Sequence, residues 1–220
     1  MGKMQKMITA RVLIVDDHEL LRDGLKGLLN SQESLLVCGE AADEEAGFRQ
    51  LRKLQPDVVI VDITLKKGNG IELIKRIHQH YPGVLIIVAS MHDEKVYGER
   101  VLRAGAMGYV SKQDPARTIL RAIRQVLDDK MFFSDVLTKR LLARAADAGF
   151  ERSPIEMLSD RELEVFTLIG QGMMTGRVAE KLNLSPRTVE TYRQRLKTKL
   201  NVDSGGELSR EAVQWVLENR

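Results

Sequence analysis

The sequence predicts an α/β doubly wound five-stranded parallel sheet, followed by a small all-α domain. Residues 11–129 alternate short, unbroken apolar runs with longer amphipathic stretches, whereas the apolar residues after Leu158 repeat at helical spacing throughout. Unbroken apolar runs are typical of strands covered on both faces, and parallel strands need crossover helices between them. A chain of 220 residues that is 43% apolar and 30% charged suits two ordinary domains and excludes the collagen-like, disordered and membrane classes.

The first part of the chain contains five pairs of one strand and one helix. The predicted strands are Arg11–Val15, Leu35–Ala41, Val58–Val61, Leu85–Ser90 and Gly108–Val110. The predicted helices are Leu20–Asn30, Asp43–Lys53, Gly70–His80, Val96–Ala104 and Pro115–Asp128. In a sheet of this kind, ligands bind beyond the carboxyl ends of the strands.

The rest of the chain is predicted to be helical. One helix is expected over Val136–Ala148, ended by Gly149 and followed by a linker to Pro154. Ser159 and Glu162 fit a capping box that begins a helix over 160–170, which Gly172 ends. The remaining predicted helices are Arg177–Leu182, Arg187–Leu200 and Glu207–Glu218. We therefore expect a first domain over 1–129 with its core at 10–129, a linker with a helix over 130–154, and a second domain over 155–220.

The cysteine content and the N-terminal residues bear on the cellular compartment. Cys38 is the single cysteine, so no disulfide can form within the chain, and no Cys/His cluster has zinc-ligand spacing. The N-terminal residues 1–7 carry charge without an apolar run behind them, so we expect neither export nor a membrane anchor. A cytoplasmic protein without a membrane partner is the expectation.

Three aspartates follow two of the predicted strands. Asp16 and Asp17 end the first strand and Asp62 ends the third, so their carboxylates should converge at one rim of the sheet. Convergent like charges are unfavourable unless a cation offsets them, and carboxylate oxygens at this density suit Mg²⁺. The alternative is that each aspartate caps the turn after its strand. Capping is a good explanation for one aspartate but a poorer one for three aspartates at matching strand ends, so the three together favour a cation site.

Two possible phosphate-binding groups end the other inner strands. Ser90 closes the fourth strand and Lys112 follows the fifth. Either residue alone would mean little, but a hydroxyl and an ammonium are the donors that a phosphorylated Asp62 would require beside Mg²⁺. Tyr109, three residues before Lys112, could equally be an ordinary half-buried strand residue.

The helix over 187–200 carries a basic stripe. Residues 176–199 contain seven lysines and arginines but only two glutamates. Val189, Tyr192, Leu196 and Leu200 form its inward stripe, which leaves polar and charged side chains outside. A solvated charged face is the usual explanation of such a surface. The preceding short helix and the tight turn at Asn183–Ser185 favour a helix-turn-helix that enters the DNA major groove.

Residues 10–129 resemble the receiver domain of two-component response regulators, which has a flavodoxin-like fold. The motifs that carry the resemblance are Val12-Leu13-Ile14-Val15-Asp16-Asp17-His18, Val58-Val59-Ile60-Val61-Asp62, Val88-Ala89-Ser90-Met91 and Gly105-Ala106-Met107-Gly108-Tyr109-Val110-Ser111-Lys112. The resemblance implies that Asp62 accepts a phosphoryl group from a sensor histidine kinase. It implies that Asp17, Asp62 and the Thr64 carbonyl bind Mg²⁺, with Asp16 helping through water. Ser90 and Tyr109 would form the switch pair, and Lys112 would pair with the phosphoryl oxygens.

Two positions depart from the receiver pattern. The family often has Met-Pro where this chain has Leu65 and Lys66, so we expect a looser loop and altered recognition by a kinase. Gln113 stands where a proline is frequent, so a cis peptide is not expected there. Neither departure removes a reactive group.

Residues 158–215 are similar to the LuxR-type helix-turn-helix domain, and the combination with a receiver resembles a NarL/FixJ-type response regulator. The matching residues include Leu158–Glu162, Val178-Ala179, Thr188-Val189-Glu190 and Lys199–Val202. The resemblance implies that Glu190, Thr191 and Gln194 face base edges. The other DNA-contacting residues it implies are Arg187, Thr188, Arg193, Arg195 and Lys197. Met174, Arg177 and Gly205 depart from the pattern and predict modest affinity as a monomer, for which dimerisation of the phosphorylated protein would compensate.

Two other functions compete with a phosphorylation-switched transcription regulator. A haloacid-dehalogenase-like phosphatase also uses an aspartate after a strand, but it requires a second aspartate where this chain has Thr64. A constitutive DNA-binding protein without a switch, or a regulator that acts through protein contacts, would not need the complete set of receiver residues. The sequence leaves open the kinase, the stimulus, the operator, the target genes, activation or repression, the dimer surface and whether the unphosphorylated form is closed.

Overall fold

The computed structural model describes residues 9–146 and 153–219. The chain forms two compact units, the first from 1–94 and 101–134 and the second from 95–100 and 135–220. The predicted helix end at Ala148 and the linker residues 149–152 lie outside the described residues. Within the described ranges, no helix has both the length and the apolar character needed to span a bilayer.

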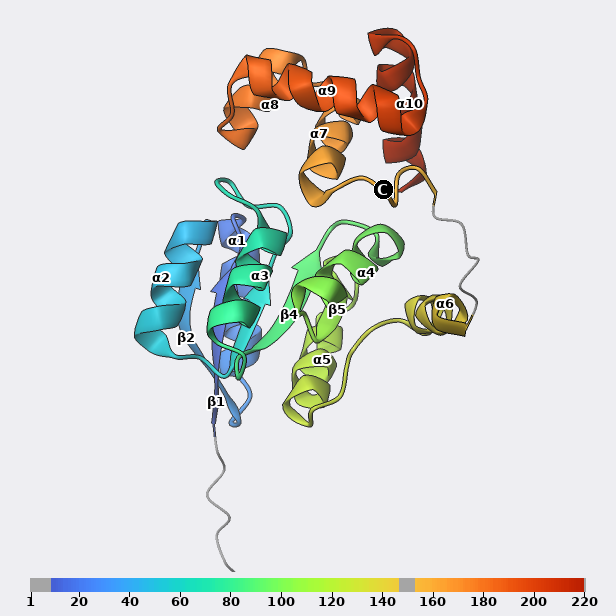
Figure 1. Ribbon diagram of the computed structural model, residues 1–220. Helices are drawn as coiled ribbons and strands as arrows, with labels where there is room; N and C mark the ends of the chain where they lie inside the picture. Colours follow the sequence, from blue (N-terminus) through green and yellow to red (C-terminus); the bar gives the residue numbers. More distant parts are fainter. Residues whose placement is uncertain (1–8, 147–152, 220) are drawn as a thin grey trace, which may run out of the picture. The chain divides into compact units, whose positions relative to one another are not determined.

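The first unit is built on a five-stranded parallel sheet with the order β2-β1-β3-β4-β5. Its strands are β1 (Ala10–Val15), β2 (Leu35–Ala41), β3 (Val58–Val61), β4 (Leu85–Ser90) and β5 (Gly108–Ser111). The helices that connect or follow them are α1 (Glu19–Asn30), α2 (Glu44–Leu54), α3 (Gly70–His80), α4 (Glu94–Ala104) and α5 (Arg117–Leu127) (Figure 1). The predicted sheet class is therefore confirmed.

Helices cover both faces of this sheet because successive strand residues point to opposite sides. Val12, Ile14 and Ile60 pack with α1 and α5, whose Leu29 and Ile123 are fully buried. Right-handed crossovers place α2 and α3 on the opposite face. The backbone of Gly47 in α2 approaches that face so closely that an added Cβ would lie 3.0 Å from the side chain of Val15. Burial of β-branched residues on both sides explains why the sequence shows unbroken rather than alternating apolar runs.

Both edges of the sheet are partly covered. At the β5 edge, Tyr109 N donates to Phe132 O at 2.8 Å, and Phe132 N donates to Met107 O at 2.8 Å. Phe132 thus forms an isolated parallel bridge with Gly108. At the β2 edge, Val37 N donates to Asn30 Oδ1 at 2.8 Å. Neither edge presents an uninterrupted row of free backbone groups.

The described part of the second unit is helical. Besides residues 95–100 of α4, it contains α6 (Asp135–Ala146), α7 (Asp160–Gly170), α8 (Thr175–Leu182), α9 (Pro186–Leu200) and α10 (Gly205–Glu218). The rings of Phe166 in α7 and Trp215 in α10 pack with their centroids 5.7 Å apart. Glu162 is buried in α7, and its Oε2 accepts a hydrogen bond from Lys199 Nζ at 2.6 Å. Burial raises the pKa of Glu162, but the hydrogen bonds from Lys199 and Ser159 outweigh burial and hold the pKa below its usual value.

The predicted start of four helices is wrong by two residues: α4 begins at Glu94 rather than Val96, α5 begins at Arg117 rather than Pro115, and α8 and α10 also differ. The helix α8 begins at Thr175 rather than Arg177, although Met174 at its N-cap provides no side-chain hydrogen bond. The helix α10 begins at Gly205 rather than Glu207, because Ser204 and Glu207 form a reciprocal capping box around its first turn. The predicted capping box of Ser159 and Glu162 is present at the start of α7.

Candidate functional site

Parallel pairing of β1 with β3 brings two buried carboxylates together. Val15 pairs with Val61 in register, so Asp16 and Asp62 leave the sheet side by side. Asp62 N donates to Val15 O at 2.9 Å, and Asp16 N donates to Ala41 O at 3.0 Å. These backbone bonds fix the positions of both aspartates, whose residues are only 2% and 3% exposed. The predicted convergence of carboxylates is thus observed.

Lys112 supplies the positive charge between these two carboxylates. Its Nζ lies 2.6 Å from Asp62 Oδ2 and 2.7 Å from Asp16 Oδ2. Burial lowers the pKa of Lys112, but the attraction and hydrogen bonds of Asp62 and Asp16 outweigh burial and raise the pKa above its usual value. Burial likewise raises the pKa of Asp62, and Lys112 only partly opposes that shift.

The remaining negative charge fits a divalent cation. Asp16, Asp17, His18 and Asp62 place one ligand atom each within 4.8 Å of one another. Among the described residues, Asp17 Oδ1 is buried without a hydrogen bond of acceptable geometry, although His18 Nδ1 lies 3.0 Å away. Three carboxylates beside one ammonium leave two negative charges in the cluster. A hard divalent cation would satisfy both the charge and the orphaned oxygen.

Ser90 and Tyr109 lie beside the carboxylates. Ser90 is fully buried at the end of β4, and its side chain hydrogen-bonds to Asp62. Tyr109 is 4% exposed, and its hydroxyl donates to the backbone oxygen of His92 at 2.7 Å. The structure therefore brings these predicted switch residues to the same rim as Asp62 and Lys112.

Two histidines at this rim were missed by the sequence interpretation. His18 joins the carboxylate cluster, and the sequence signal is its position directly after Asp17. His92, two residues after Ser90, has its Nε2 2.8 Å from the hydroxyl of Thr64. Burial and then the nearby Lys112 lower the pKa of His92 to about 4. No single-sequence pattern distinguishes a loop histidine of this kind from a solvated one.

The loop between β3 and α3 is held by α2. Glu44 N donates to Lys67 O at 3.2 Å, and Asn69 N donates to Glu44 Oε2 at 3.0 Å. Asn69 also caps α3 by accepting from Ile71 N at 2.8 Å. These contacts give no support to the expectation of a looser loop. An added Cβ at Gly70 would lie 2.0 Å from Asp62 O, so only glycine fits there.

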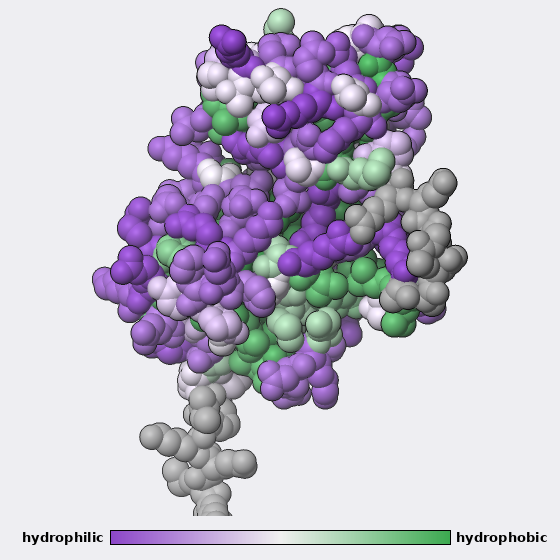
Figure 2. Space-filling model, viewed as in Figure 1, coloured by the Kyte–Doolittle hydropathy of each residue, from purple (hydrophilic) through white to green (hydrophobic). Residues whose placement is uncertain are grey.

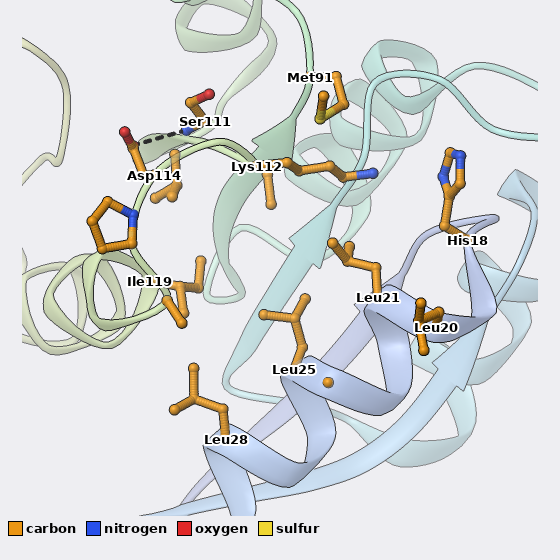
Figure 3. Close-up of a pocket in the computed structure, with 15 residues that line it drawn as sticks. His18, Leu20, Leu21, Leu25, Leu28, Met91, Ser111, Lys112, Asp114 and Ile119 are labelled. Atoms are coloured by element: carbon orange, nitrogen blue, oxygen red, sulfur yellow. Dashed lines mark hydrogen bonds between the residues drawn. The ribbon is translucent and has the colours of Figure 1, made fainter.

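An apolar groove of about 650 Å³ lies beside the carboxylates. Figure 3 shows leucines of α1 facing Ile119 of α5, with Lys112 and His18 at one end of the groove. Leu20 is 87% exposed and Met91 is 55% exposed at this rim. Lys112 and His18 therefore belong both to the lining of the groove and to the carboxylate cluster.

The helix α9 presents one polar face. Val189 and Leu196 are fully buried, whereas the exposed side chains repeat at helical spacing. The exposed residues of α9 are Pro186, Arg187, Glu190, Thr191, Gln194, Arg195, Thr198 and Lys199. The part of this surface visible in Figure 2 is predominantly hydrophilic. The face contains the three predicted base-reading residues.

Four further predicted DNA-contacting residues differ in exposure. The residues Thr188, Arg193 and Lys197 are half-buried, and the Arg193 side chain is 18% exposed. Arg193 lies toward the first turn of α10, because an added Cβ at Gly205 would contact its guanidinium at 3.6 Å. Arg195 is exposed and lies with its guanidinium carbon 5.8 Å from the centroid of the Tyr192 ring. Arg195 is therefore the more accessible of these two arginines.

Comparison with known proteins agrees with both parts of this geometry. The response regulator receiver domain family matches residues 12–124, and the bacterial regulatory proteins of the luxR family match residues 156–212. The response regulator UvrY of Escherichia coli K12 is 33% identical over 208 residues, which cover 94% of this chain and 95% of UvrY.

Two solved structures of RcsB are also similar. RcsB from Salmonella enterica serovar Typhimurium, bound to promoter P1flhDC in the presence of the phosphomimetic BeF3−, is 29% identical with a TM-score of 0.66, covering 93% of this chain and 98% of that chain. A structure of two RcsB dimers bound to two parallel DNAs is 31% identical with a TM-score of 0.56, covering 92% and 96% of the two chains.

The chain belongs to the NarL/FixJ family of response regulators, in which a receiver precedes a LuxR-type DNA-binding domain. It is a transcription regulator rather than an enzyme of the ordinary kind.

Proposed function

We propose that Asp62 accepts a phosphoryl group from the phosphohistidine of a sensor histidine kinase and that this modification switches dimerisation and DNA binding. The observation that carries the proposal is the buried contact of Lys112 with Asp62 and Asp16, beside the orphaned oxygen of Asp17. Such an arrangement suits charge neutralisation during phosphoryl transfer, which depends mainly on alignment and electrostatics.

Each group at the rim has a role in this transfer. An Asp62 oxygen attacks phosphorus while the bond to the histidine nitrogen breaks, and Lys112 Nζ then pairs with a phosphoryl oxygen. Mg²⁺ would be held by Asp17, Asp62 and the Thr64 carbonyl, with Asp16 acting through water, and would neutralise phosphoryl charge. Ser90 donates its hydroxyl to the phosphoryl group, and Tyr109 packs behind it as the second switch residue.

The partners follow from the two exposed surfaces. The groove between α1 and α5 is lined at one end by Lys112, which contacts Asp62, so we propose it as the surface that receives the kinase helix carrying the phosphohistidine. The exposed face of α9 would enter the DNA major groove, with Glu190, Thr191 and Gln194 reading bases. Arg187, Thr188, Arg193, Arg195 and Lys197 would position the helix on the backbone.

The remaining functional expectations complete the proposal. We propose a homodimer as the phosphorylated form, since a second copy adds a second half-site. Self-phosphorylation and loss of the phosphoryl group would be its only catalysis. The proposed domains are 1–129, with core 10–129, and 155–220, joined by 130–154. A DNA target and an unpaired Cys38 suit action in the cytoplasm.

Labelling with acetyl phosphate and MgCl2 tests the phosphorylation site. Intact-mass measurement should show one added phosphoryl group in the wild-type protein and none in Asp62→Ala. Asp57→Asn is the matched control, because Asp57 is exposed at the other end of the same strand and should leave labelling intact. Full labelling of Asp62→Ala would end the site assignment, and steady turnover of phosphate esters would favour the phosphatase alternative.

Duplexes selected from a random-sequence pool test the DNA surface. The affinity for DNA should rise with beryllofluoride and MgCl2 in the wild-type protein but not in Asp62→Ala. If the wild-type affinity is the same with and without these additions, the protein is a DNA-binding protein without a switch. Arg195→Ala should weaken binding to all selected duplexes and reduce the salt slope by about 0.9 per protomer. Arg210→Ala removes an exposed arginine of α10 and should change neither quantity.

A further inference from the structure

The predicted base-reading residue Glu190 of α9 is held by a second helix. Its Oε1 accepts a hydrogen bond from the hydroxyl of Thr175, the first residue of α8, at 2.7 Å. Arg193 lies one turn further along α9, and its Nε is 3.9 Å from the same carboxylate oxygen. A side-chain hydrogen bond and a nearby cation therefore fix one oxygen of Glu190 at the polar face of α9.

The two carboxylate oxygens of Glu190 have different surroundings. Both contacts are made by Oε1, while the side chain as a whole is 54% exposed. Within the part of the chain that the structure describes, Oε2 has no hydrogen-bond partner. A carboxylate only accepts hydrogen bonds, so Oε2 stays available to a donor from outside. The neighbouring Thr191 differs, because its hydroxyl donates to Arg187 O of its own helix at 3.1 Å.

The start of α8 also favours a negative charge at this place. Met174 at the N-cap provides no side-chain hydrogen bond, and the first turn of α8 contains no acidic residue. The aligned peptide dipoles give the N-terminus of a helix a partial positive charge, which attracts a nearby carboxylate. Glu190 supplies this charge from α9, so the hydrogen bond from Thr175 lies where the electrostatics of α8 support it.

A carboxylate in the major groove discriminates among base edges because it cannot donate. Guanine N7 and O6 and thymine O4 are acceptors, so they repel it. Adenine presents its amino group beside the acceptor N7, whereas cytosine presents the N4 amino group as a donor without an acceptor of its own beside it. A carboxylate that is fixed at the groove therefore selects cytosine.

We propose that Thr175 positions Glu190 to read one cytosine in each half-site of the operator. Oε1 stays on the Thr175 hydroxyl while Oε2 accepts from cytosine N4. This proposal rests on the proposed insertion of α9 into the major groove. Thr175 is a positioning residue, since it acts through Glu190 and contacts no base. A carboxylate that is held before DNA arrives loses less conformational entropy on binding than a free one.

Binding to a duplex that the wild-type protein selects from a random-sequence pool, and to its single-base-pair variants, tests the proposal in beryllofluoride and MgCl2. Wild type should prefer cytosine at one position of the half-site about tenfold. Glu190→Ala should lose this preference. Thr175→Val removes the hydroxyl at nearly constant volume, and it should lower the preference about fivefold, the usual net effect of one hydrogen bond.

Further variants separate positioning from a general structural effect. For duplexes without the cytosine, Thr175→Val should bind as wild type does, whereas a structural defect would weaken binding to every duplex. Thr175→Ser keeps the hydroxyl and should keep the preference. Thr198→Val is the matched control, because Thr198 is exposed on α9 and its hydroxyl donates to Gln194 O at 3.2 Å. It should leave the cytosine preference unchanged.

The double variant and the remaining outcomes complete the test. Thr175→Val combined with Glu190→Ala should discriminate no worse than Glu190→Ala alone, because both remove the same interaction. An additive loss, or an equal loss for every duplex in Thr175→Val, would assign the Thr175 hydroxyl to a separate contact with DNA and overturn the proposal. A Glu190-dependent preference for another base would refute the assignment of cytosine.

Failure of the proposal is distinguishable from failure of the proposed reading face. If Gln194→Ala changes a base preference while Glu190→Ala and Thr175→Val change none, only the positioning of Glu190 is refuted. If none of these variants changes a preference at any position, the proposed reading of bases by α9 is refuted as well.

Discussion

Asp17→Asn should stabilise the metal-free protein and abolish its stabilisation by Mg²⁺. The Asp17 side chain is 21% exposed, its Oδ1 is buried, and one of its carboxylate oxygens lies within 4.8 Å of the ligand atoms of Asp16 and Asp62. Asparagine keeps the shape of the side chain but removes one of three converging negative charges. Without a cation, that charge is a cost to the folded state.

The magnitude follows from the geometry of the cluster. Two unit charges about 5 Å apart interact by about 3 kcal/mol at an effective dielectric constant of about 20. Asp17 meets two such carboxylates, but the ammonium of Lys112 beside them offsets much of the repulsion. We expect a net gain of about 1–3 kcal/mol in the free energy of unfolding. Saturating Mg²⁺ should stabilise wild type by about 1.4 kcal/mol for each tenfold excess over its dissociation constant.

Urea unfolding with and without MgCl2 at constant ionic strength measures both effects. Trp215 is the only tryptophan and lies in the second unit, so its fluorescence follows that unit while circular dichroism follows the whole chain. Asp23→Asn makes the same charge change at an exposed position of α1 and should leave the Mg²⁺ effect intact. A metal-free Asp17→Asn less stable than wild type, or one still stabilised by Mg²⁺, would refute the reasoning.

Two further substitutions test the support of each unit. Gly70→Ala should lower the free energy of unfolding by about 1–3 kcal/mol and slow the labelling of Asp62, because the added Cβ would lie 2.0 Å from Asp62 O. Urea unfolding and labelling rates measure both effects. Gly83→Ala is the control, because the space around Gly83 is open, and equal behaviour of the two variants would contradict the prediction. Lys199→Met should destabilise the second unit by about 1 kcal/mol near neutral pH, as read by Trp215 fluorescence. Folding lowers the pKa of Glu162, so the stabilisation by the Lys199–Glu162 pair is present above the unfolded pKa and is lost as the pH falls through the folded pKa. If wild type and Lys199→Met still differ in stability at acidic pH, the difference does not come from this pair.

Much of the first unit could be predicted because its strands are buried on both faces. The boundaries of Leu35–Ala41, Val58–Val61 and Leu85–Ser90 coincide with the predicted ones, since each run is bounded by polar or turn residues. Convergence of Asp16 and Asp62 follows from parallel pairing alone, so the sequence pattern was sufficient to predict it.

Helix starts were harder to predict where local propensity conflicts with capping. Gly205 and Gly206 disfavour a helix, yet the capping box of Ser204 and Glu207 fixes that turn. The same signal was recognised at Ser159 and overlooked at Ser204. Similarly, Gly176 concealed the first turn of α8.

The hydrogen bond between Thr64 Oγ1 and His92 Nε2 could not be predicted from the sequence. Each residue lies in a loop, and their distance depends on how two loops leave different strands of the sheet. Periodicity determines which face of a strand is buried, but it contains no information about contacts between loop side chains. Such pairs require the three-dimensional arrangement.

The covered margins of the sheet restrict how two receivers can associate. With Phe132 bridged to Gly108 of β5 and Asn30 bonded to Val37 N of β2, each edge is partly occupied, which disfavours continuation of the ladder by a neighbouring molecule. Self-recognition then falls to the packing of side chains on helices. An interface of that kind can be strengthened or weakened by small rotations, which suits a reversible signal better than a continuous main-chain ladder.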